Sequence, residues 1–236
     1  NNVWSSTVES DILSKNVSAG TGGVDVMPTA PTSTSYFAQF VELAGYTSTL
    51  TLTNPSRTNS APAAVQLRNS DGSVGKVKLN GVDHPNGIGS AAVPPLGTRS
   101  LSTDPTTTQT NVGAMAVLST QPLAGTVLFS GSPGVAGVGR SELLKDFIAP
   151  IELNAAKQVN SGVAIANPSN ASISVVLKLR DKGGNILQKT LDLGPYGHTA
   201  QFIDQLFPNV AKDSTGTLIA SSATEVAATV LRSAPG

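Results

Sequence analysis

The chain has 236 residues, 39% hydrophobic and only 13% charged, and its 15 basic residues are balanced by 15 acidic ones. A neutral chain without a basic cluster lacks the positive field that nucleic-acid phosphates require, so we expect no nucleic-acid partner. The absence of cysteine excludes disulfides, thiolate nucleophiles and cysteine-ligated metals. Ser, Thr, Asn and Gly must supply the polar surface, a composition that suits secreted bacterial β-proteins better than cytosolic enzymes.

Residues 1–35 are expected to form an extended N-terminal arm. In VDVM, Val24 and Val26 alternate with polar or flexible neighbours, and Trp4 is the single tryptophan of the chain. One interpretation is a flexible leader. The other is a strand added to the sheet edge of a neighbouring subunit, with Val24 and Val26 facing inward and Trp4 as an anchor. These three residues are the predicted assembly residues.

From residue 36 onward the apolar residues alternate with a period of two, which predicts strands rather than helices. The first set of predicted strands covers residues 36–43, 46–53, 62–69, 75–80, 97–102, 112–119 and 123–130. The second set covers residues 147–153, 160–167, 173–180, 186–193, 198–203, 215–221 and 226–233. Gly, Pro and Asn in NGVDHPNGIGSAAV predict a loop inserted in the first set.

The two sets are related by an internal repeat. Asn54-Pro55-Ser56 recurs 113 residues later as Asn167-Pro168-Ser169, and LRNSDGSV recurs as LRDKGGNI at an offset of 112. PPLGTRSLSTD aligns with GPYGHTAQFID at an offset of 100 residues. The last two predicted strands of the first unit align without gaps with those of the second, at an offset of 103 residues. Because the landmarks keep their order, we infer two related units of about 100 residues each.

The predicted fold is therefore all-β, with two tandem antiparallel β-sandwich (Ig-like) units preceded by an extended N-terminal arm. A small barrel is the alternative for each unit. The predicted boundaries are residues 1–35 for the arm, 36–133 and 147–236 for the two units, and 134–146 for their connection. The polar TDPTTTQTN of the first unit stands where IDQLFPN of the second predicts a short helical turn.

The repeated Asn-Pro-Ser is interpreted as a strand terminator. Proline favours an extended residue before it and cannot donate to a ladder, and Asn and Ser side chains bond the backbone of a turn. A ligand role is the alternative.

No pattern of catalytic or metal-ligating residues emerges, so we predict no catalytic residue, no cofactor and no metal site. The two histidines, His84 and His198, form no metal-binding motif, and a surface position is expected for both. No nucleophile elbow is present. The acidic candidates for a paired-carboxylate site mostly fall at predicted turns, and they are Asp83, Asp104, Asp181, Asp192 and Asp204. Calcium bound by loop acids stays open as an alternative.

The stretch from YFAQFVELAGYTSTLTLTNPS onward, with its second copy GVAIANPSNASISVVLKLRDKGGNIL and LGPYGHTAQFIDQLFP, resembles tandem β-sandwich repeats of secreted and surface proteins of environmental bacteria. The resemblance covers residues 36–233. It implies a structural or adhesive role outside the cell and no catalytic residues. The first copy departs from the pattern because it lacks FIDQLFP and carries the insertion.

These observations predict a secreted or cell-surface, non-catalytic structural or adhesive protein, a subunit of a filament, pilus or similar appendage. The expected partner is another copy or another surface-protein subunit. No apolar run approaches the ~20 residues that cross a bilayer, so no membrane-spanning segment is expected. An extracellular ligand-binding module for polysaccharide or a surface protein is the main alternative, and a hydrolase is the third.

Overall fold

The computed structural model describes residues 34–108, 110–131 and 134–233. The predicted assembly residues Trp4, Val24 and Val26 lie outside these ranges, so their role stays a prediction. We refer to residues 34–139 as the first half and to residues 143–233 as the second half. No helix in the described ranges is long and apolar enough to span a membrane.

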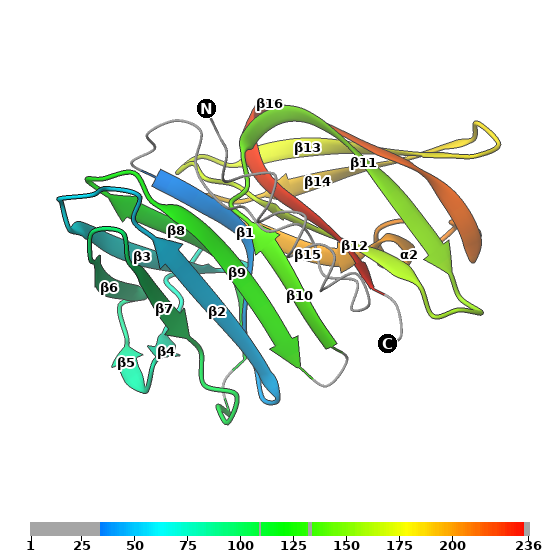
Figure 1. The fold of residues 1–236 in the computed structure, drawn as a ribbon. Coiled ribbons are helices and arrows are strands. Elements are labelled where there is room, and N and C mark those ends of the chain that lie inside the picture. The colour runs from blue at the N-terminus through cyan, green and yellow to red at the C-terminus, as the bar shows by residue number, and fades with distance from the viewer. Residues whose placement is uncertain (1–33, 109, 132–133, 234–236) are drawn as a thin grey trace.

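The first half is an antiparallel sandwich of two four-stranded sheets (Figure 1), with strand orders β1-β8-β3-β6 and β10-β9-β2-β7. A short hairpin, β4-β5, lies at one end. The strands are β1 (Thr34–Glu42), β2 (Tyr46–Thr53), β3 (Ala61–Asn69), β4 (Val77–Leu79), β5 (Val82–His84), β6 (Ile88–Val93), β7 (Thr98–Ser102), β8 (Asn111–Ser119), β9 (Ala124–Gly131) and β10 (Gly134–Gly139).

The second half repeats this pairing order in a continuous network, β14-β13-β16-β12-β15, in which β11 also pairs with β16. Residues 213–221 of β16 lie between β11 and β13, whereas residues 227–233 pair with β12, and the strand bends between these parts (Figure 1). The elements are β11 (Leu143–Asn154), β12 (Asn160–Ala166), β13 (Ile173–Asp181), β14 (Ile186–Leu193), β15 (His198–Phe202), α2 (Ile203–Leu206) and β16 (Asp213–Ser233).

Each half has its own apolar core, built from the inward residues of the alternating strands. Leu50 and Leu52 of β2 are buried in the first core, and their counterparts Val163 and Ile165 of β12 are buried in the second. Burying a side chain of this size stabilises a fold by about 1.5–3 kcal/mol. The period-two pattern therefore predicted the core faces of these strands correctly, and the all-β antiparallel fold is confirmed.

Three strands lie where the sequence predicted none, and one of them is the short β5 of the β4-β5 hairpin. Strand β6 falls in the expected loop and pairs with β3 as β14 pairs with β13, so β6, and not residues 75–80, is the counterpart of β14. Strand β10 falls in the expected connection and pairs with β9. Both strands (IGSAAV and GVAGVG) are rich in Gly, Ala and Ser, so their alternation is weak and their glycines resemble turn signals.

Polar contacts recur at matching positions of the two halves. Asn54 and Asn167 are both buried, and each side-chain amide donates to two backbone carbonyls while its oxygen accepts the N–H two residues later. These bonds support the strand-terminator interpretation of Asn-Pro-Ser. Buried Ser48 likewise bonds both the N–H and the carbonyl of Val41.

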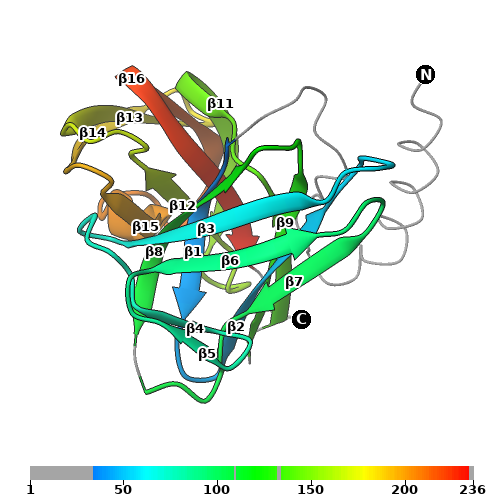
Figure 2. The ribbon, with the colours of Figure 1, turned by 90° about the vertical axis from the view of Figure 1, so that its left-hand side faces the viewer.

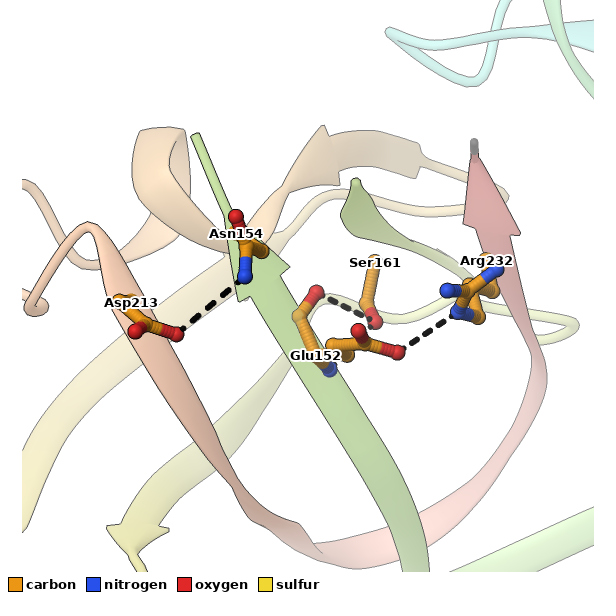
Figure 3. Close-up of polar contacts among 5 residues, drawn as sticks. All are labelled: Glu152, Asn154, Ser161, Asp213 and Arg232. Carbon is orange, nitrogen blue, oxygen red and sulfur yellow. Dashed lines mark hydrogen bonds and ion pairs between the residues drawn. The ribbon is translucent and has the colours of Figure 1, made fainter. Parts of the chain in front are cut away.

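The counterpart of that serine, Ser161 of β12, bonds the N–H and carbonyl of Glu152 on the preceding strand, β11 (Figure 3). Here the contact is extended, because the Glu152 carboxylate also accepts a hydrogen bond from Nε of Arg232 at 2.7 Å. That hydrogen bond from Arg232 lowers the pKa of the Glu152 carboxyl below its ordinary value. Nearby, the Asn154 amide lies 3.5 Å from a carboxylate oxygen of Asp213.

Candidate functional site

Two features stand out as candidate sites: the interface between the halves, and a polar cleft at the far end of the first half. The interface uses the outward side chains of β12, β15 and the end of β16. We call these residues the second-half outer face, namely Ala164, Ala166, His198, Ala227, Thr229 and Leu231. Their neighbours in each strand point into the second core.

The centre of this interface is apolar and closely packed. Ala38 of β1 clusters with Ala164, Ala166 and Ala227, and all four side chains are buried. The ladder between β1 and β8 shifts register between Phe37 and Phe40, and such a bulge redirects the side chains that it contains. Ala38 and Gln39 both lie in this bulge and both contact the second half, Ala38 by packing and Gln39 through His198. The small alanines allow two backbones to approach closely.

His198 is the polar centre of the interface, and the expectation of a surface position is wrong for it. Its side chain is only 4% exposed. Nε2 lies 2.9 Å from Oε1 of Gln39, and Nδ1 lies 3.2 Å from Oγ of Ser70, so each ring nitrogen has a partner in the first half. Burial lowers the pKa of His198 to about 4, because the charged ring would lose its hydration. The ring is therefore neutral at pH 7.

A second contact joins the two halves beside His198. The guanidinium of Arg68 lies 4.5 Å from the centre of the Tyr196 ring, within the range of a cation–π interaction. Gly72 sits against the carbonyl of Pro195 so closely that a Cβ atom at this position would overlap it. A mostly apolar cavity of about 120 Å³ remains between the halves, beside Tyr36 and Tyr196.

The polar cleft lies around the β4-β5 hairpin, at the end of the first half away from the second half (Figures 1 and 2). Its volume is about 570 Å³. Because β6 is the counterpart of β14, the inserted residues are those between β3 and β6, and they form this hairpin. The opposite wall is the polar loop after β7. The side chains that carry chemistry here are Glu42, Lys78, Asp83, His84, Asp104 and Thr106.

Two of these groups are held in defined orientations. Nδ1 of His84 lies 3.1 Å from the carbonyl of Ile88, so this nitrogen carries the proton of the neutral ring. Asp104 accepts hydrogen bonds from the hydroxyl and the amide of Thr106, which lower the pKa of its carboxyl, with a smaller effect from Lys78. The Lys78 ammonium lies 3.9 Å from Asp104. This partly buried pair gives the cleft both signs of charge beside the half-buried His84.

Glu42 is the one fully buried acidic side chain among the described residues, at 1% exposure. Its carboxylate accepts hydrogen bonds from the backbone N–H of Lys78 and from the Asn111 amide. The Asn111 amide also donates to the carbonyl of Lys76. Since a buried carboxylate is tolerated only when it is hydrogen-bonded, Glu42 is best explained as the anchor of the inserted hairpin.

The second half closes the same end of its sandwich with apolar side chains. By sheet register, Leu153 and Ser214 stand where the first half has Glu42 and Asn111. The α2 turn packs against β11, β12 and β15 and buries Ile203 and Leu206. The first half closes its core instead with Val77 and Leu79 of the inserted hairpin.

The remaining predicted acids do not form one site. Asp181 is at the end of β13, Asp192 is in β14, where it accepts a hydrogen bond from Ser174, and Asp204 is in α2. Of the five predicted acids, Asp83 and Asp104 alone line a common site, which is the polar cleft. Within the ranges that the structure describes, no group of three or more His, Asp or Glu side chains is arranged to hold a metal ion.

Sequence reasoning missed both candidate sites. The inserted segment and the missing FIDQLFP are two separate departures from the repeat in sequence, and the fold brings them to the same end of one sandwich. Comparison with known proteins adds no further constraint, because no model of a known family and no curated protein matches the chain.

Proposed function

We propose that this protein is a non-catalytic, extracellular structural subunit that associates with further copies of itself. The observation that carries the proposal is the interface between the halves. There the fold buries an outward, uncharged sheet face against a neighbouring sandwich through alanine packing and a neutral, hydrogen-bonded histidine. A chain whose sandwiches stack in this way has the means to continue the stack with another molecule.

The composition supports the same role. Only 13% of the residues are charged, and charges, especially lysine, are the usual means by which natural proteins keep exposed strands and faces from associating. The outer face of the β10-β9-β2-β7 sheet is covered mainly by hydroxyl groups. Thr49 bonds Ser102 and Thr51 bonds Ser100 across the strands. Such a face is soluble but offers little electrostatic repulsion to a second copy.

The test is the mass of the full chain in solution, measured by light scattering over a concentration series and followed by electron microscopy. We expect oligomers or filaments that grow with concentration. A chain that stays monomeric at millimolar concentration would remove the basis of the proposal. A full-chain variant with Val24→Asp and Val26→Asp tests whether the predicted arm takes part.

A second candidate function, ligand binding, is favoured by the polar cleft. Its mixture of a histidine, an ion pair and threonine hydroxyls suits an uncharged polyhydroxylated ligand, which would exchange hydrogen bonds with all of them. A titration with a panel of neutral oligosaccharides, monitored by the NMR signals of His84, tests this function. We expect His84→Ala to lose any binding seen, and binding that survives both His84→Ala and Asp104→Asn would place the ligand elsewhere.

A further inference from the structure

We propose that successive copies associate head to tail by repeating the interface that joins the two halves of one chain. This inference rests on the proposed function and names the surfaces that carry it. It follows from the repeat: both sides of the internal interface have counterparts in the other half, and the residues named below are exposed or partly exposed there.

The first exposed counterpart is the hydroxyl face, the outer surface of the β10-β9-β2-β7 sheet. Its positions correspond to the second-half outer face, with Thr51 and Thr53 standing where the second half has Ala164 and Ala166. These threonines are partly exposed, whereas the two alanines are buried in the internal interface. Among the described residues, this sandwich surface is thus covered in the second half and partly exposed in the first.

The second exposed counterpart is on β11. In the internal interface, Tyr36 and Ala38 of β1 receive the second half. By register with β8 and β16, Ile148 is the counterpart of Tyr36, and Pro150 stands where β1 has the bulge that contains Ala38. Ile148 is 71% exposed, the largest fraction of any large hydrophobic side chain described, and Pro150 is exposed as well. An isoleucine in this position is costly in water and gains from being covered.

The loops beside these surfaces show the same difference, because residues packed in the internal interface have exposed counterparts in the other half. Gly72 is packed under Pro195 in the internal interface, whereas its counterpart Gly184 has no atom within 4 Å of where a Cβ would lie. Tyr196 stacks on Arg68, whereas its counterpart Leu96 is 65% exposed. The hydroxyl face and the side of β11 that carries Ile148 therefore correspond in position to the two sides of the internal interface.

The geometry determines the kind of assembly. We call the side of β11 that carries Ile148 and Pro150 the Ile148 surface. The hydroxyl face belongs to the first half and the Ile148 surface to the second half, so a single copy has one of each. A contact between two different surfaces is heterologous, and it produces a filament unless the rotation happens to close a ring. The partner is thus another copy of this chain, docked with its hydroxyl face on the Ile148 surface of the copy before it.

The experiment blocks each surface separately in the full chain. Ile148→Glu places a charge on one surface, and Thr53→Arg places a bulky charge on the other. We expect each variant to be monomeric by light scattering at concentrations where the unmodified chain assembles. Val82→Glu is the matched control, because Val82 is also an exposed branched aliphatic side chain, at 58%, and it lies on the β4-β5 hairpin, which belongs to neither proposed surface. The control should assemble like the unmodified chain.

Mixing the two blocked variants provides the sharper test. Each retains one working surface, so an equimolar mixture should form a one-to-one dimer and stop. A misfolded variant could not form this dimer, and circular dichroism melting provides a second check that both variants fold. A mixture that stays monomeric would overturn the inference.

The outcomes separate the inference from the proposed function. If the unmodified chain never assembles, both are overturned. If it assembles and Ile148→Glu and Thr53→Arg assemble equally well, the inference is overturned while the proposed function stands. In that case, loss of assembly in the Val24→Asp, Val26→Asp variant would identify the arm as the coupling element.

Discussion

The two halves of this chain share a framework of buried glycine, asparagine and serine contacts, yet they differ at the ends of their sandwiches and on their outer sheet faces. The first half ends in a polar cleft and presents hydroxyl groups on its outer sheet. The second half plugs the same end with α2 and presents alanines on the same sheet, where the first half covers them. The comparison shows that the repeat constrains backbone geometry strongly and leaves sandwich ends and outer faces free to diverge.

The framework glycines offer the strongest way to break this comparison. Gly113 and Gly216 occupy the same position in the two halves, and a Cβ on either would overlap the carbonyl oxygen of Arg68 or Arg180 on the adjacent strand. Because backbone atoms cannot step aside like a flexible side chain, we expect Gly113→Ala and Gly216→Ala each to lower the free energy of unfolding by about 3 kcal/mol. Urea unfolding measures this change.

Gly194→Ala is the control for that pair, since no atom lies within 4 Å of the added methyl group. It should leave the free energy of unfolding nearly unchanged. If the Gly113 and Gly216 variants differed widely in their effect, the two positions would not be equivalent.

The second comparison concerns the buried asparagines at the ends of two matching strands, Asn54 and Asn167. Asn54→Ala and Asn167→Ala each remove three hydrogen bonds and leave backbone carbonyls without their donor. An unsatisfied buried polar group costs about 1–3 kcal/mol, so we expect a loss of about 2–3 kcal/mol for either variant. Thermal melting followed by circular dichroism checks this, with exposed Asn86→Ala as the control. A loss no greater than in the control would contradict the turn interpretation.

His198 gives the two halves a different dependence of stability on pH, because the first half has Thr98 at the matching position and a threonine does not titrate. The pKa of His198 is about 4 when folded and 6.5 when exposed, so between these values the unfolded chain binds a proton that the folded chain does not. This contribution to stability is complete above pH 6.5 and is lost as the pH falls towards 4. Between pH 7 and pH 5 the loss should be about 2 kcal/mol.

Urea unfolding of the unmodified chain and of His198→Gln at several pH values measures that contribution. Subtracting the two curves removes the effect of every other titrating group. Equal slopes for both proteins between pH 7 and pH 5 would show that the ring is already accessible to water.

The paired serines should give the smallest effect. Ser48→Ala and Ser161→Ala each remove one hydroxyl that bonds an N–H and a carbonyl of the adjacent strand, and we expect each to cost about 1 kcal/mol. Hydrogen exchange of the amides of Val41 and Glu152 reports on the two sites separately. If Ser48→Ala speeds exchange at Val41 but Ser161→Ala leaves exchange at Glu152 unchanged, or the reverse, the two serines are not equivalent.

Much of the fold could be predicted from the sequence, because strand periodicity and turn chemistry are local. The alternation in LTLT and SVVLKLR placed the core faces of β2 and β13, and the repeated Asn-Pro-Ser located the ends of two matching strands. Strands β6 and β10 were missed since glycine and alanine carry little periodic signal. Strand β6 pairs with β3 across the inserted hairpin, whereas β10 pairs with β9, the strand directly before it.

The sequence by itself determined the period-two strands, the order of the two repeated units and the turns that end their strands, since each of these depends on residues close together in the chain. Tertiary structure decided the rest. It buried His198 against Gln39, which is 159 positions away, and it brought the insertion and the loop after β7 to one cleft. The first outcome depends on how the two sandwiches stack, and thus on side chains from both halves at once, and the second depends on how distant segments of one sandwich are brought together by strand pairing.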